Sequence, residues 1–155
     1  MSWGLLLNSL ALAAPVALAA VAVGWLVALF IASSRGWVRW VALAGAVVSL
    51  ALPPFLVVNA WLGLLGHAGV LKPWLPLDIY SHGGAAWVLA LMLWPLPCLM
   101  CLGALKRLTA ELLDAEPGLG GWPLVRSLLL PMTLPAALQS GLIVFALAFK
   151  DRKST

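Results

Sequence analysis

Long stretches without charge constrain this chain more than any other feature. The first 34 residues, from Met1 to Ser34, contain no Asp, Glu, Lys or Arg. Within them, residues 5–31 would extend about 40 Å as a helix, more than the roughly 30 Å hydrocarbon core of a bilayer. Inside lipid, backbone polar groups are satisfied only within a helix or a closed barrel. The segment therefore predicts a membrane-spanning helix.

A secretory signal peptide is the alternative interpretation of this first run, because the ALAA sequence near Ala19 resembles a cleavage site. Signal peptides have a basic n-region and a shorter apolar region. No Lys or Arg precedes Arg35. The pattern favours a retained span.

Composition extends this interpretation to the whole chain. Of 155 residues, 64% are hydrophobic and 9% are charged, whereas soluble domains carry about 25% charged residues. We expect an all-α integral membrane protein, a single transmembrane domain over residues 1–155 with no separate globular domain. The net charge of +4 comes from bases at the ends of apolar runs, which indicate topology and headgroup contact and not nucleic-acid binding.

Three further apolar runs complete a prediction of about four transmembrane helices. They cover residues 40–66, 83–105 and 127–149. Residues 40–52 alone would rise only about 20 Å, too little to cross a bilayer. We therefore expect the second run to be one span, kinked at Pro53 and Pro54.

Other prolines and glycines punctuate these runs. Pro15 and Gly24 are expected to kink or loosen the first span. Pro95 and Pro97 lie in the middle of the third. The fourth has its prolines in its first turns, where a missing amide is best tolerated.

Three polar side chains within the apolar runs are candidates for a translocation pathway: Asn8, Asn59 and Gln139. Each would be costly against lipid, so we expect them to face other helices or an aqueous path. An ordinary interhelical hydrogen bond is the alternative explanation.

No pattern indicates catalysis, a cofactor or a metal. Cys98 and Cys101 form a CxxC pair among Leu, Met and Pro, which favours a role as small apolar residues over redox chemistry. The spacing of His67, Asp78 and His82 fits no ligand pattern, so we expect solvated loop residues. The chain also lacks a GxxxxGK[ST] phosphate loop.

The longest polar interruption covers residues 106–126. It holds six of the fourteen charged residues: Lys106, Arg107, Glu111, Asp114, Glu116 and Arg126. Leu108, Leu112 and Ala115 recur at helical spacing among the acids, which predicts a short amphipathic helix along the membrane face, ended by Pro117 and Gly118. A solvated connector between two spans is the alternative.

The residues after this helix carry a family resemblance. Gly118, nine residues and then LLLP, with Leu128, Leu130 and Pro131 in register, resemble the loop signature of permease subunits in binding-protein-dependent ABC importers: E-A-A, three residues, Gly, nine residues, I-x-L-P. The PMTLPAALQSGLIVFALAF and LLLNSLALAAPVALAAVAVGWLVALFIA stretches are similar to helices of the same domain. LPPFLVVNAWLGLLG and IYSHGGAAWVLALMLWPLP most resemble the ferric-iron, thiamine and polyamine type.

The resemblance implies a role without catalysis. Loop 106–126 would be cytoplasmic, and a coupling helix from Leu108 to Gly118 would dock on an ABC ATPase subunit, with Glu111 and Asp114 as rim charges and Leu112 and Leu113 as buried contacts. Leu130 and Pro131 belong to the same coupling segment. The other implied partners are a second permease subunit or copy and an extracytoplasmic solute-binding protein. The implied location is the bacterial cytoplasmic membrane.

Two departures from the family pattern leave alternatives open. The E-A-A triplet should fall on Leu112, Leu113 and Asp114, and none of the three matches, although Glu111 stands one position early. The family also has membrane helices before and after this stretch, so we expect a fragment, an interrupted gene or half of a split permease. A small stand-alone membrane protein and a non-functional permease remnant are the other functional readings.

Overall fold

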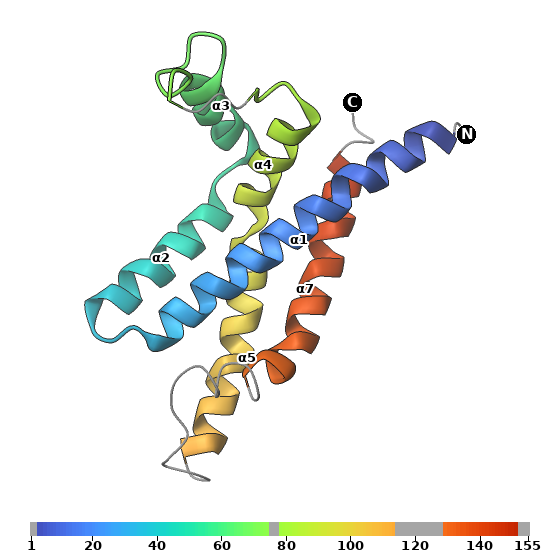
Figure 1. Cartoon of the computed structure of the whole chain (residues 1–155). Helices are drawn as coiled ribbons and strands as arrows, with labels where there is room; N and C mark the ends of the chain where they lie inside the picture. The colour runs from blue at the N-terminus through green and yellow to red at the C-terminus, as the bar shows by residue number, and fades with distance from the viewer. Residues whose placement is uncertain (1–2, 75–77, 114–128, 152–155) are drawn as a thin grey trace.

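The computed structural model is a bundle of α-helices (Figure 1). It describes residues 3–74, 78–113 and 129–151, with the backbone alone at 5–6, 108–113 and 151. The helices are α1 Trp3–Ser33, α2 Trp37–Ala51, α3 Pro54–Leu65, α4 His82–Leu93, α5 Pro95–Leu113 and α7 Leu130–Asp151. Over these residues no strand forms, which confirms the prediction of an all-α chain.

Two helices are long and apolar enough to cross a membrane alone. They provide the candidate spans Leu7–Ser33 and Leu130–Lys150. The pairs α2 with α3 and α4 with α5 pass the same test when each is counted as one broken span, which gives up to four. The predicted number of about four spans corresponds to this upper value.

The second predicted span is far more sharply broken than a kink. α2 ends at Ala51, Leu52 is extended with φ −66° and ψ 130°, and α3 begins at Pro54. A residue before proline is biased away from helical geometry, and here both Leu52 and Pro53 are extended. The two helices consequently meet at 103°.

The third predicted span bends less because its chain stays helical through the break. Trp94 keeps right-handed helical geometry, and the Cys98 amide donates to the Trp94 carbonyl at 3.2 Å. Pro95 and Pro97 have no amide hydrogen to donate. The resulting bend between α4 and α5 is 40°.

The first helix is the centre of the bundle. α1 lies across α4, α5 and α7 (Figure 1), and it is uninterrupted through Pro15 and Gly24. Its buried residues near the N-terminal half are mostly small and meet α4 and α7: Leu12, Ala13, Val16, Ala17 and Ala20 pack with Ala90, Leu93, Val144 and Ala148. Small residues let helices approach closely, which is the main source of helix association in lipid.

The outer surface is apolar, as expected for helices that face lipid. Leu18 and Leu142 are 73% and 70% exposed. Soluble monomers rarely expose large contiguous apolar surfaces. The burial pattern therefore agrees with a membrane environment around the bundle.

The two ends of the bundle are distinct (Figure 1). The turn between α1 and α2, the end of α5 and the start of α7 lie at one end, which we call the loop end. The start of α1, the end of α7, α3 and the start of α4 lie toward the other.

The end of α5 differs from the prediction. The third span was expected to finish at Leu105, with a separate helix starting at Leu108, yet α5 continues from Pro95 to Leu113. The predicted boundary followed the first charges, but Lys, Arg, Leu, Ala and Glu are all strong helix formers. Charged residues mark where a helix passes from lipid into water, but they do not end the helix. α7 is described from Leu130 onward, and residues 127–128, where the fourth span was predicted to begin, lie outside the described residues.

Candidate functional site

The candidate coupling site lies where α5 leaves the buried bundle. Leu105 is 2% exposed, whereas Lys106 and Arg107 are exposed. From there the helix continues to Leu113, a rise of about 12 Å. Figure 1 shows this end of α5 extending past the turn between α1 and α2. The helix thus extends beyond the apolar part of the bundle.

The predicted coupling residues fall into three groups. Leu108, Glu111, Leu112 and Leu113 belong to the helical backbone at the end of α5. Leu130 and Pro131 are exposed in the first turn of α7. Asp114 and Gly118 lie outside the described residues.

A groove between α5 and α7 contains one of the predicted pathway residues. Its volume is about 470 Å³, and it is lined by Leu99, Met100, Gly103, Ala104, Arg107, Met132, Ala136 and Gln139. Arg107 supplies a positive charge and Gln139 an amide, while most of the other lining groups are apolar. The sequence predicted Gln139 as a pathway residue, but it did not predict that Arg107 lines the same groove.

The structure does not bring the three predicted pathway residues together. Asn8 lies near the start of α1, its Nδ2 atom 3.5 Å from Nε2 of His82. Asn59 is exposed on α3, and Gln139 lies in the groove between α5 and α7. These residues therefore do not form one polar centre within this chain.

A partly buried hydrogen bond that the sequence did not predict joins α1 to α7. The Trp25 indole Nε1 donates to the Thr133 hydroxyl at 2.9 Å. That hydroxyl in turn donates to the Leu129 carbonyl at 2.6 Å, and Thr133 is 1% exposed. Trp25 and Thr133 are far apart in sequence and follow no shared motif, so only the fold pairs them. The bond fixes the first turn of α7 against α1.

Gly24 of α1 packs directly against the break between α4 and α5. A Cβ atom built on Gly24 would lie 2.7 Å from the Trp94 carbonyl oxygen and 2.8 Å from the Cys98 nitrogen. Both are backbone atoms, which cannot move aside as a flexible side chain can. The sequence predicted that Gly24 loosens α1, but the fold uses it for close backbone packing.

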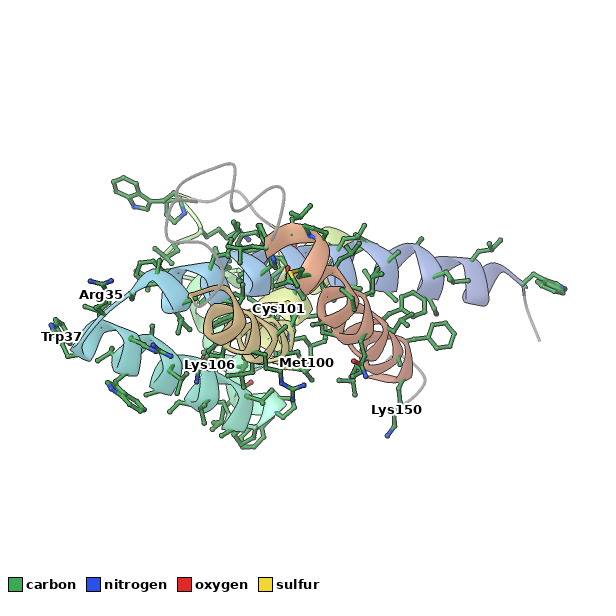
Figure 2. The ribbon with its side chains drawn as sticks, turned by 90° about the horizontal axis from the view of Figure 1, so that it is seen from below. Arg35, Trp37, Met100, Cys101, Lys106 and Lys150 are labelled. Carbon is green, nitrogen blue, oxygen red and sulfur yellow. The ribbon has the colours of Figure 1, made fainter. Side chains whose placement is uncertain are left out.

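The CxxC pair lies in the apolar interior. Cys98 and Cys101 are free thiols with no exposed surface. They pack in one cluster with Ala28, Ile31 and Leu102, and Figure 2 shows Cys101 at the centre of the bundle. This location fits the interpretation of both as small apolar residues.

Polar residues at the opposite end organise the start of α4. The Ser81 hydroxyl accepts from the Gly84 amide at 3.1 Å and caps the helix, and it donates to the Asp78 carbonyl at 2.6 Å. The His67 ring stacks on Tyr80 with centroids 4.8 Å apart. His67 therefore packs against Tyr80, whereas His82 begins α4 and lies near Asn8.

Comparison with known proteins adds no relative: the sequence matches no protein-family model, and no curated protein matches it significantly. A functional interpretation therefore depends on the residues and geometry of this chain.

Proposed function

We propose that this chain is a membrane-spanning permease component of an ABC importer, forming part of the solute pathway and coupling to an ATPase subunit. The observation that carries the proposal is the spacing of Gly118, Leu128, Leu130 and Pro131, which resembles the family's loop signature. That segment joins the end of α5 to the start of α7.

The geometry of α5 supports a coupling role. Its backbone is one helix from Pro95 to Leu113, so a force applied to its exposed end reaches the buried Cys98 and Cys101 without crossing a flexible joint. Beyond them lies the break at Trp94, in contact with Gly24 of α1. Docking of an ATPase on the loop end would therefore move α5 relative to α1.

The groove between α5 and α7 gives this motion a consequence for transport. Arg107 and Gln139 line it from the two helices that the central loop connects. Rocking of α5 would change the separation of these polar groups, which is how a solute path opens to one side at a time. The energy comes from ATP on the partner, and a second permease subunit or copy and a solute-binding protein complete the importer in the bacterial cytoplasmic membrane.

The direct test is a site-specific cross-link. A photoreactive amino acid replaces Leu112 in the full chain, in native membranes, and Val70 at the opposite end is the matched control position. We expect the Leu112 probe to form an adduct with an ATP-binding subunit, identified by labelling with a photoreactive ATP analogue. The Val70 probe should give none. An ATPase adduct from neither position would favour a stand-alone membrane protein.

Gly118→Trp tests coupling separately from docking. We expect the variant to insert into membranes normally while solute-stimulated ATPase activity is lost, because the family places a tight exit at this glycine. Gly45→Trp, on α2 where a Cβ atom meets nothing within 4 Å, is the matched control. Unchanged uptake and ATPase activity in the Gly118 variant would refute the coupling assignment.

A further inference from the structure

A second cavity at the loop end has a different chemistry from the groove between α5 and α7. It measures about 460 Å³ and is lined by Ser34, Arg35, Gly36, Arg39, Trp40, Leu43 and Lys106. Three of these side chains are cationic and come from the turn before α2, from α2 and from α5. We call this cavity the basic pocket. Its size lies within the range of about 300–1,000 Å³ that is usual for ligand sites.

The positive charge of the basic pocket is not neutralised by its described surroundings. Asp78 is the one acidic residue whose side chain the structure describes, and it lies at the opposite end of the bundle beside Tyr80 and Ser81. Three cations gathered around one cavity repel one another unless an anion joins them. The charge pattern thus favours an anionic ligand.

The backbone at the start of α2 adds to the same field. Gly36 has φ 65° and precedes α2, whose first turn has no side-chain cap. The first amides of a helix lack intrahelical acceptors and carry a partial positive charge. Gly36, Arg39 and Trp40, at this start of α2, line the basic pocket, so the partial charge of the helix start has the same sign as its cationic side chains.

The tryptophans beside the basic pocket indicate the source of the anion. Trp37 and Trp40 are 74% and 71% exposed, and tryptophan concentrates at the level of lipid headgroups. Figure 2 shows Arg35 and Trp37 at the outer edge of this end and Lys106 beside α5. Trp40 and Leu43 give the pocket an apolar wall next to its charges. A phospholipid offers the matching pair, a phosphate beside an apolar glycerol ester region.

We propose that the basic pocket binds the headgroup phosphate of an anionic phospholipid, with Arg39 and Lys106 bridging α2 and α5 through it. The bound lipid would join α2 and α5 at this end. Inorganic phosphate shares the charged group but lacks the apolar part. The site is independent of the proposed transport role, since it requires only the membrane and the fold.

The test uses the full chain in detergent, titrated with phosphatidylglycerol, phosphatidylcholine or inorganic phosphate and followed by native mass spectrometry. We expect retained phosphatidylglycerol, little phosphatidylcholine and no competition by millimolar phosphate. Arg39→Gln with Lys106→Gln should weaken phosphatidylglycerol binding about 25-fold, at about fivefold for each charge near the surface. Lys72→Gln with Lys150→Gln removes two charges outside the pocket and should change binding less than twofold.

Further variants make the result independent of folding. Arg39→Lys with Lys106→Arg keeps both charges and should retain binding within about threefold of the parent chain. If the loss in the Gln variants came from a folding defect at these positions, the charge-retaining pair would lose binding too. Equal losses in the pocket and control pairs would overturn the proposal, as would equal retention of phosphatidylcholine. Inorganic phosphate that displaces the lipid at comparable concentration would identify a free-anion site instead.

Discussion

Small residues determine how closely the central helices pack. Gly24 touches backbone atoms of the break between α4 and α5, whereas Gly45 on α2 has open space around its Cα atom. Both are glycines in apolar helices, and glycine costs about 1 kcal/mol relative to alanine in a helix interior. Only the structure shows that this cost is offset by packing at one position and not at the other.

Gly24→Ala should therefore destabilise the protein although alanine is the better helix former. Overpacking against backbone costs about 1–3 kcal/mol, which exceeds the propensity gain. Gly45→Ala should be neutral or stabilising by up to about 1 kcal/mol. Reversible unfolding in mixed micelles with increasing denaturing detergent measures both. Similar effects of the two substitutions would show that α1 does not approach α5 as closely as described.

The Trp25 to Thr133 hydrogen bond should contribute measurably to stability. Thr133→Val keeps the shape but removes the acceptor, and we expect a loss of about 1 kcal/mol. Thr133→Ser keeps the hydroxyl and should recover most of that loss. A double-mutant cycle with Trp25→Phe isolates the bond from packing. A coupling energy near zero would mean that the bond adds nothing to the folded state.

At the scale of residues, the sequence predicted the burial of the CxxC pair better than it predicted which residues meet. The CxxC pair was expected to be apolar, and it lies in the core. Gly24 was expected to loosen α1, and instead it contacts the α5 backbone. Side-chain type decides whether a residue can be buried, but the partner depends on which helices cross, and that requires the fold.

Breaks between helices follow local rules that the sequence displays. α2 and α3 are separated because Leu52 precedes a proline and cannot easily be helical. Pro54, by contrast, sits in the first turn of α3, where proline is tolerated. The position of the break was therefore predictable. Its angle of 103° was not, because two extended residues reorient the following helix freely until tertiary contacts fix it.

Removing both prolines should straighten this part of the chain. In Pro53→Ala with Pro54→Ala, an unbroken helix would place Gly45 and Gly63 about 27 Å apart. Both positions have open surroundings, so cysteine-attached spin labels there, in a chain with Cys98 and Cys101 replaced by Ala, can report the distance by pulsed electron paramagnetic resonance. Pro54→Ala alone should remain bent, because Leu52 still precedes Pro53. No lengthening in the double variant would show that tertiary packing sets the bend.

The end of α5 could not be predicted from hydropathy. α5 runs beyond the apolar stretch because its charged residues are good helix formers. Hydropathy marks where a helix leaves lipid, not where its backbone hydrogen bonds stop. The same distinction explains why about four apolar runs were identified correctly as helical while one boundary was placed at Leu105.

For the molecule as a whole, the topology depends on whether α2 and α3 form one broken span or a re-entrant loop. A broken span puts the loop after α3 on the opposite side from the turn at Arg35, whereas a re-entrant loop would return it to the same side. Figure 1 places α3 with the start of α4, away from that turn. The geometry therefore favours a broken span.

Thiol labelling in sealed vesicles tests this topology. Single cysteines replace Trp37, Val70 and Lys150 in a chain with Cys98 and Cys101 changed to Ala. We expect a membrane-impermeant reagent to label the Val70 and Lys150 positions from one side and the Trp37 position only from the other. Labelling of Trp37 and Val70 from the same side would identify a re-entrant loop.

The contact at Gly24 has a mechanical consequence for this arrangement. Because Gly24 places no side chain of α1 against the Cys98 backbone, sliding of α5 along α1 would bring the larger neighbouring residues of α1 into collision, whereas tilting about that point would not. Leu113 lies about 22 Å along the helix from Cys98, so a tilt of about 5° displaces the far tip by about 2 Å. A small displacement of the exposed end of α5 would therefore rotate this helix about its contact with Gly24, in the centre of the bundle.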